Sequence, residues 1–423
     1  MSAPFRRPCA RAFSPAHALA FRLRCQRLDQ RTEEPLDEIA RAVAYPPAPG
    51  GTTPYLALHA RAPRYERSLL DHAVFDEQEL IELPFARHST VLAPPADAPV
   101  VLAAARKGHD ERVQPLVASG LVDAKKRARL AEAIVCALAD GPLAADDLRS
   151  RLPEPLCVPF GERGRKTGFP SLFTFVLREL QLGGQVLRVQ RDRRLDREGY
   201  LYALPRRPLA APEDRPVALA LLAARYFRAF APAHASAFAF WADASLTETR
   251  TAIADAGLAS VPIDGQKEPA LLGPEQVDEL HAFVPPVPGR LAFVPFRDPA
   301  VSGDRELKGL LPDAHREVKL ADWRGRLVPA GGGSAVHQHF LLSGGLITGL
   351  WEFDPIDRQV RFATFEPLPS RVKRAAEEIA SDLAAWIVQE LGSARFYGDE
   401  RGDGFGRLDQ VVASWAVTSP RRR

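Results

Sequence analysis

The chain has 423 residues, which is too long for one simple hydrophobic core and predicts roughly two to four domains. Its hydrophobic fraction of 46% and charged fraction of 26% are ordinary for a globular protein. No apolar run is long enough to cross a bilayer, and the basic N-terminus lacks the apolar core of a signal peptide. We therefore expect a cytoplasmic protein with no membrane partner.

Basic residues are concentrated in one segment. The formal net charge of the whole chain is only +3, but residues 161–207 hold eleven Arg or Lys against five acids, a surplus of six. A local excess of this kind is typical of a surface that binds a polyanion, whereas a merely solvated face mixes the two signs more evenly. The four cysteines are scattered without the paired spacing of a zinc or redox site, and we expect reduced thiols.

The first 105 residues predict a run of short helices and a terminal hairpin. A helix is expected over 14–30, with Ser14 as its N-cap and Pro15 at its first position. A second short helix ends before the Pro- and Gly-rich stretch 46–53, and a third follows it. A further helix, a turn and an extended pair complete the segment. This order is that of a winged helix, and we assign residues 1–105 to a first module.

A second module is expected over 106–210. An amphipathic helix closed by Gly141 and a short second helix lead through the basic loop "GERGRKTGFP" to a third helix over 170–182. Two strands around an Arg-rich turn follow. The apolar side chains of the third helix recur at helical spacing and predict one buried stripe. That stripe consists of Phe169, Leu172, Phe173, Val176, Leu177 and Leu180.

The rest of the chain predicts a third module over 211–284 and a β-rich domain over 285–423. The third module has a capping box from Ser245 to Glu248 at the start of one helix. From residue 285, strands joined by Gly-rich turns precede a long amphipathic helix. The expected fold class is α+β, with tandem winged helix-turn-helix modules followed by a small β-barrel-like domain that carries a C-terminal helix.

The helix over 170–182, with its basic approach and Arg-rich wing, is the clearest functional signal. Its Arg and Lys side chains would neutralise phosphates, and binding would weaken steeply with salt. Ser171 and Thr174 are small enough to approach a groove, and Arg178 can reach a phosphate or a guanine edge. Winged helices also serve as protein-interaction modules, which remains an alternative. The candidate DNA-binding residues are Arg163, Arg165, Lys166, Ser171, Thr174, Arg178, Arg191, Arg193 and Arg194.

Other chemical motifs are weak. His337 and His339 are two apart on an expected strand and share a face, but no third zinc ligand can be named from spacing, so surface histidines are favoured. The run "GGGS" at 331–334 lacks the Lys and the following helix of a phosphate loop. Asp298 and Asp304 lie on a loop beside arginines, where structural ion pairs are commoner than general bases.

Several stretches together resemble one family, the bacterial winged-helix proteins that include the DNA glycosylases AlkZ and YcaQ. These stretches are "SPAHALAFRLRCQRL", "TPYLALHARAPRYERSLLDHAVFDEQELIELPFARHSTVLAPP", "AFAPAHASAFAFWADASLTETRTAIADAGL", "VPFRDPAVSGDRE" and "GGLITGLWEFD". The resemblance is spread over nearly the whole chain. It implies winged helices and a β domain around a concave, basic surface for double-stranded DNA. It also implies hydrolysis of the N-glycosidic bond of alkylated or crosslinked bases, without a metal or organic cofactor.

The sequence departs from this family at the catalytic motif. The glycosylases carry Gln-x-Gln or Gln-x-Asp before a Pro-Tyr-Leu-like helix, and here that position falls on residues 43–45 or 47–49, which contain no Gln, Asp or Glu. His88 matches a His of the crosslink-acting branch, and Asp298, Asp304 and Arg305 match its Asp-Pro…Asp-Arg loop. We therefore take His88 and Asp298 as the candidate catalytic residues. A non-catalytic DNA-binding protein, protecting lesions or regulating transcription, and a protein-interaction scaffold remain alternative hypotheses.

Overall fold

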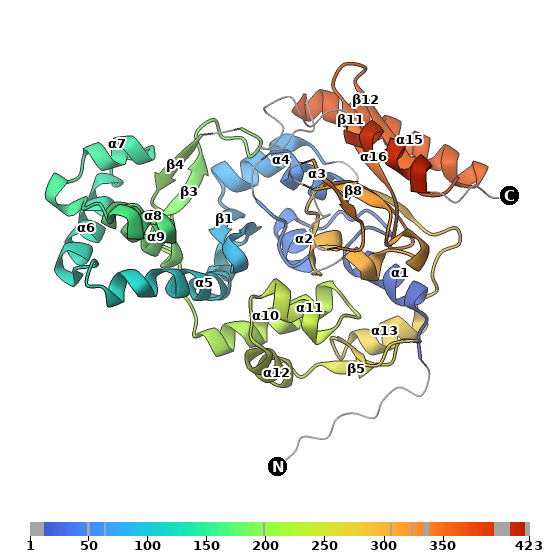
Figure 1. Cartoon of the computed structure of the whole chain (residues 1–423), viewed down its shortest axis with the longest axis horizontal. Coiled ribbons are helices and arrows are strands. Elements are labelled where there is room, and N and C mark those ends of the chain that lie inside the picture. The colour runs from blue at the N-terminus through green and yellow to red at the C-terminus, as the bar shows by residue number, and fades with distance from the viewer. Residues whose placement is uncertain are drawn as a thin grey trace, which may run out of the picture.

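The protein is a mixed α+β structure of many helices and small antiparallel sheets, as expected from the sequence (Figure 1). The computed structural model describes residues 12–48, 51–62, 65–197, 199–304, 307–322, 325–332, 338–392 and 407–418. No helix in this described part is long and apolar enough to cross a membrane.

The N-terminal segment forms short helices and one hairpin. Ser14 caps the first helix by accepting a hydrogen bond from the His17 amide, which confirms the predicted helix start. After α2, the chain from Pro46 to Ala48 lies along strand β2, where the Ala48 amide donates to the Thr90 carbonyl at 3.0 Å. The Pro-rich loop is therefore partly an edge strand. The elements are α1 (Pro15–Cys25), α2 (Leu36–Ala42), α3 (Thr53–His59), α4 (Arg67–Asp71), β1 (Ile81–Pro84) and β2 (Thr90–Ala93).

The second segment has its own hydrophobic core. The predicted apolar stripe of the helix over 170–182 is confirmed, because all six of its side chains are buried there together with residues of α6 and α7. This lobe lies apart from the C-terminal helices, at the other end of the molecule (Figure 1). Its elements are α5 (Ala98–Ala118), α6 (Ala124–Ala137), α7 (Ala145–Ser150), α8 (Gly161–Thr167), α9 (Leu172–Leu182), β3 (Leu187–Gln190) and β4 (Tyr200–Ala203).

The third segment shares a core with the first. Ser245 and Glu248 form the predicted capping box at the start of α12. Side chains of α10 and α11 pack against Tyr45, Phe85 and Leu102 in one cluster, which draws on residues from both sides of the expected boundaries at 105/106 and 210/211. The elements are α10 (Arg215–Ala229), α11 (Ala235–Trp241), α12 (Leu246–Asp255), β5 (Ala259–Val261), β6 (Ala270–Leu272) and α13 (Gln276–Ala282).

The C-terminal segment contains a four-stranded antiparallel sheet in the order β12-β11-β10-β7. Alternate side chains enter different cores: Phe293 joins α3 and α15 on one face, whereas Val294 joins α1 on the other. Because helices cover both faces, the sheet stays open, and no closed barrel is found among the described residues. The elements are β7 (Leu291–Val294), α14 (Pro299–Ser302), β8 (Lys319–Ala321), β9 (Leu327–Pro329), β10 (His339–Ser343), β11 (Leu346–Asp354), β12 (Gln359–Thr364), α15 (Ser370–Trp386) and α16 (Arg407–Thr418).

Candidate nucleic-acid interface and active site

The turn between β1 and β2 places His88 where the first three segments meet. This turn (η2, Ala86–His88) contacts α5, and its central residues Arg87 and His88 have φ of 56° and 57°. Both are therefore in the left-handed region, which a tight hairpin turn normally fills with Asn and Gly. A residue held there costs on the order of 1 to 3 kcal/mol, and such strain is commonest at functional sites. The strain makes the turn a candidate functional element.

His88 is an exposed side chain that lies over Gly108 of α5. Its Cε1 and Nε2 atoms are 3.2 and 3.4 Å from the position that a Cβ on Gly108 would take, and Asp243 Oδ2 is 3.8 Å from the same position. Burial, followed by the positive charges of Arg112 and Arg178, lowers the pKa of His88, whereas Asp243 opposes this shift. The imidazole is therefore mainly neutral at pH 7 and able to accept a proton.

Arg87, the other residue of the turn, reaches the third segment. Its guanidinium lies 3.4 Å from the centre of the Phe240 ring of α11, a cation–π contact. Burial, and then the nearby charge of Arg87, lowers the pKa of Arg297. We call the side chains of Arg87, His88, Arg112, Arg178 and Arg297 the central basic cluster. Its members come from four separate parts of the chain. Arg112 acts on Arg178, both disfavour a proton on His88, and Arg87 acts on Arg297.

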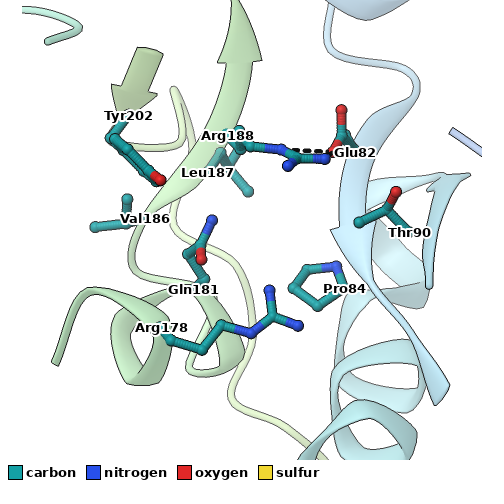
Figure 2. Close-up of a pocket in the computed structure, with 9 residues that line it drawn as sticks. All are labelled: Glu82, Pro84, Thr90, Arg178, Gln181, Val186, Leu187, Arg188 and Tyr202. Atoms are coloured by element: carbon teal, nitrogen blue, oxygen red, sulfur yellow. Dashed lines mark hydrogen bonds and ion pairs between the residues drawn. The ribbon is translucent and has the colours of Figure 1, made fainter. Parts of the chain in front are cut away.

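A small pocket of about 70 Å³ continues the cluster along the hairpin (Figure 2). Arg178 of α9 points toward Pro84, and Gln181 lies beside it. Across the pocket, Arg188 donates to the buried Glu82 carboxylate at 2.9 Å. The other oxygen of Glu82 accepts a hydrogen bond from Gln190, also at 2.9 Å.

Arg178 has no comparable partner. Within the described part of the chain it makes no ion pair with an acid within 4 Å, and burial, followed by the charge of Arg188, lowers its pKa. A half-buried cation that lacks an acidic partner is a favourable site for an anion such as a phosphate.

The sequence-predicted cations on α8 extend the basic surface. Arg163, Arg165 and Lys166 are exposed, and Lys166 pairs with Glu162 at 2.9 Å. Arg112 links α8 to the central basic cluster, because its Nη1 atom is 3.7 Å from the Cβ position of Gly168, at the end of α8.

The turn between β3 and β4 carries the remaining predicted cations. Arg191 is exposed. Arg193 forms an ion pair with Asp76, and Arg194 binds Asp196 through two hydrogen bonds of 2.6 and 2.8 Å. These two charges are therefore partly offset within the protein.

Ser171 and Thr174 shape the start of α9. Ser171 is the N-cap, and its hydroxyl accepts from the Thr174 amide at 3.3 Å while the Thr174 hydroxyl accepts from the Ser171 amide. Ser171 is buried. The structure therefore places both hydroxyls in a capping box instead of on an open helix face.

Asp298 is completely buried and ion-paired. Its two carboxylate oxygens accept from the Arg61 guanidinium at 2.7 and 2.8 Å, and one of them also accepts from the Ala300 amide at the start of α14. This geometry gives Asp298 no solvent-facing oxygen and argues against the catalytic role expected from the sequence. The neighbouring Arg305 lies outside the described residues.

The position of the family's catalytic motif is apolar and closed. Val43, Ala44 and Tyr45 are each at most 3% exposed, and the Tyr45 hydroxyl accepts a hydrogen bond from Arg225. Arg225 also binds the carboxylate of Asp97 at 3.2 Å, and Asp97 binds Arg41 at 3.1 Å. Residue 49, in the other possible alignment, lies outside the described residues.

The histidine pair expected on a strand cannot be tested as a pair, because His337 lies outside the described residues. His339 stacks on Trp351 with ring centres 4.2 Å apart and accepts a hydrogen bond from the Phe296 amide at Nδ1. It is buried, so it is not the surface histidine that the sequence favours.

Sequence reasoning missed Gly108, Arg112 and Asp243, all of which surround His88. An isolated glycine inside the helix-forming stretch "ARKGHDER" was a usable signal, since such a glycine often marks a close approach of another side chain. Nothing in the local sequence indicates that Asp243, 155 positions after His88, lies beside the same glycine.

Fold and site together describe a mixed α+β protein that gathers cations from several segments around His88. Residues 40–386 match the family model described as DNA glycosylase AlkZ-like, and the chain belongs to this family. Among solved structures it is similar to Streptomyces sahachiroi DNA glycosylase AlkZ, with a TM-score of 0.70 and 20% identity over 91% of this chain and 99% of that one. No match was found among curated protein sequences.

Proposed function

We propose that this protein binds double-stranded DNA and acts in the repair of alkylated or crosslinked bases, as a DNA glycosylase that uses residues outside the usual motif. The central basic cluster is the observation that carries this proposal. Like charges repel when they are gathered in a partly desolvated site, and a polyanion relieves that repulsion. Membership of the AlkZ-like family supports DNA as that polyanion.

The proposed DNA path runs from the central basic cluster over α8 to the turn between β3 and β4. We assign phosphate contacts chiefly to Arg163, Arg165, Lys166, Arg178 and Arg191. Arg193 and Arg194 contribute less, because acids of the protein already offset their charges. Ser171 and Thr174 contribute by capping α9.

The order helix, helix, helix, hairpin in α6, α7, α9 and β3–β4 supports a winged helix over 106–210. We retain the corresponding proposals for 1–105 and 211–284, and for the β-rich unit over 285–423. In each of the first three units the helices precede a two-stranded hairpin.

A non-catalytic DNA-binding protein is the second candidate function. The closed, apolar environment of residues 43–45 favours it, since no carboxylate or carboxamide there can polarise a water. The two candidates share the DNA-binding surface and differ in whether an abasic site forms.

Salt-dependent binding to duplex DNA tests the shared part. We expect the affinity to fall steeply with salt, and the variant Arg163→Ala/Arg165→Ala/Lys166→Ala to make the log–log slope shallower by up to about 2.7, or roughly 0.9 for each lost phosphate contact. The matched control is Arg371→Ala/Lys373→Ala/Arg374→Ala on α15. This triplet is also exposed, and its lysine also pairs with a glutamate four residues away. Binding that is independent of salt, or equal losses in the two triple variants, would contradict the proposal.

A further inference from the structure

Asp243 is fixed through its backbone carbonyl oxygen, and these contacts do not use its carboxylate. Its φ of 53° is left-handed, and its carbonyl oxygen accepts hydrogen bonds from Lys107 at 3.1 Å and Arg215 at 2.9 Å. Arg215 in turn binds Glu248 at 2.7 Å, within the capping box of α12. Two cations therefore fix the link between α11 and α12 against α5, directly opposite Gly108.

His88 and Asp243 resemble each other in three respects. Each is a non-glycine residue in the left-handed region, each reaches solvent, and each lies within 4 Å of the Cβ position of Gly108. Within the described residues, neither side chain has a hydrogen-bond or ion-pair partner among the protein's other groups. Two strained residues from different segments thus direct unsatisfied polar groups to one point that Gly108 leaves open.

We propose that His88 and Asp243 together hold the water that hydrolyses the N-glycosidic bond, with His88 as its proton acceptor and Asp243 as a second acceptor that orients this water. This inference rests on the proposed function and supplies the pair that the closed motif position at residues 43–45 lacks. The nearby carboxylate also stabilises the imidazolium that forms, since Asp243 raises the pKa of His88.

The step balances without a further reactant. The water oxygen bonds to C1′ of the sugar, and the bond between C1′ and the base nitrogen breaks with its electron pair going to the base. A purine alkylated at N7 carries a positive charge and leaves as a neutral base. The water proton passes to His88 and then to solvent, which reaches this exposed ring. An abasic sugar with a hydroxyl at C1′ remains.

The surrounding charges couple this step to DNA binding. The titratable and charged groups around His88 are Arg112 and His109 of α5, Arg178 of α9, and Asp243, whereas the guanidinium of the adjacent Arg87 lies over Phe240. In the free protein the arginines disfavour a proton on His88. Phosphates bound to Arg112 and Arg178 would offset those charges and raise the proton affinity of His88 only when substrate is present.

The test measures abasic-site formation under single-turnover conditions on a duplex containing one N7-methylguanine, together with the affinity for that duplex. We expect His88→Gln and Asp243→Asn to slow the reaction by about 100-fold, the lower end of the usual contribution of a general base. Affinity should change less than about threefold, because neither residue contacts a phosphate in the proposal. Asp255→Asn, at an exposed site on α12, is the control for the lost carboxylate.

Gly108→Ala separates position from chemistry, because it leaves both side chains intact. A Cβ at Gly108 would be 3.2 Å from His88 and would displace the ring, whereas alanine favours the helix. We expect a raised melting temperature with a rate reduced about tenfold or more. Gly309→Ala is the control, since no atom lies within 4 Å of its Cβ position.

The pH profile distinguishes a positioning role from a structural one. The rate of the wild type should fall in acid as His88 is protonated, and Asp243→Asn should move this limb to lower pH, because Asp243 raises the pKa of His88. Unchanged rates in the three variants, beside a wild type that forms abasic sites, would overturn the inference alone. A wild type that binds the duplex without forming abasic sites would overturn the glycosylase function together with the inference and favour the non-catalytic candidate. Failure to bind duplex DNA at low salt would instead overturn the DNA binding that both candidate functions share.

Discussion

Arg61 and Asp298 form a completely buried, two-point ion pair between residues 237 positions apart. Arg61 follows α3 in the N-terminal segment, and Asp298 caps α14 beside the C-terminal sheet. The guanidinium also donates to the Ala57 carbonyl at 2.7 Å and the Gln26 carbonyl at 2.9 Å, so the pair ties α1, α3 and α14 together.

Replacing Asp298 should therefore lower the free energy of unfolding, independently of any effect on activity. In Asp298→Asn the buried Arg61 loses its counter-charge, and we expect a loss of about 3 kcal/mol in the free energy of unfolding. Removal of both charges in Arg61→Met/Asp298→Asn should recover part of this loss. Urea unfolding measures both values. A variant Asp298→Asn with wild-type stability and lost activity would restore Asp298 as a catalytic candidate.

Arg178 and Arg188 face the same pocket but should respond oppositely to mutation (Figure 2). Arg178→Gln removes a half-buried cation whose pKa is lowered by burial and by Arg188, so we expect unchanged or slightly raised stability and about tenfold weaker DNA binding. Arg188→Gln leaves the buried Glu82 with Gln190 alone, and we expect a loss of about 3 kcal/mol. Thermal melts and DNA titration of both variants check this contrast. Destabilisation by Arg178→Gln equal to that of Arg188→Gln would show that Arg178 has a structural role.

His109 should make the stability of the second segment sensitive to acid. It is 5% exposed, lies against Phe169 and Phe175, and neither ring nitrogen has a hydrogen-bond partner among the described residues. Burial, followed by the charge of Arg178, lowers the pKa of His109 to about 4. Because the unfolded chain binds the proton near pH 6.5, stability is full above that pH and falls as the pH drops toward 4, by up to about 3 kcal/mol.

His109→Phe should remove this loss and pack well against the neighbouring rings. Unfolding free energies at pH 7.5 and pH 5 give the measurement. Some acid sensitivity should remain in the variant, because burial also lowers the pKa of His59, to about 3. An identical pH dependence in wild type and variant would show that His109 is protonated in the folded protein without cost.

The sequence by itself determined the elements whose signals are local. The Ser14 cap, the capping box at Ser245 and the apolar stripe of α9 follow from hydrogen bonds and side-chain spacing within one helical turn or one helix face. The surplus of positive charge over 161–207 and the absence of a carboxylate or carboxamide at residues 43–45 are likewise direct readings of the chain.

Only the tertiary structure decided which of these residues are buried in ion pairs and which remain exposed. Whether Asp298 is a buried ion-pair partner or an exposed acid depends on Arg61, and whether His88 stands alone depends on Gly108 and Asp243. Arg61 and Asp298 are 237 positions apart, and His88 and Asp243 are 155 positions apart. Such pairings arise when several segments pack into common cores. Local periodicity carries no information about these long-range contacts. They are selected by the free energy gained when separate segments bury their apolar surfaces against one another.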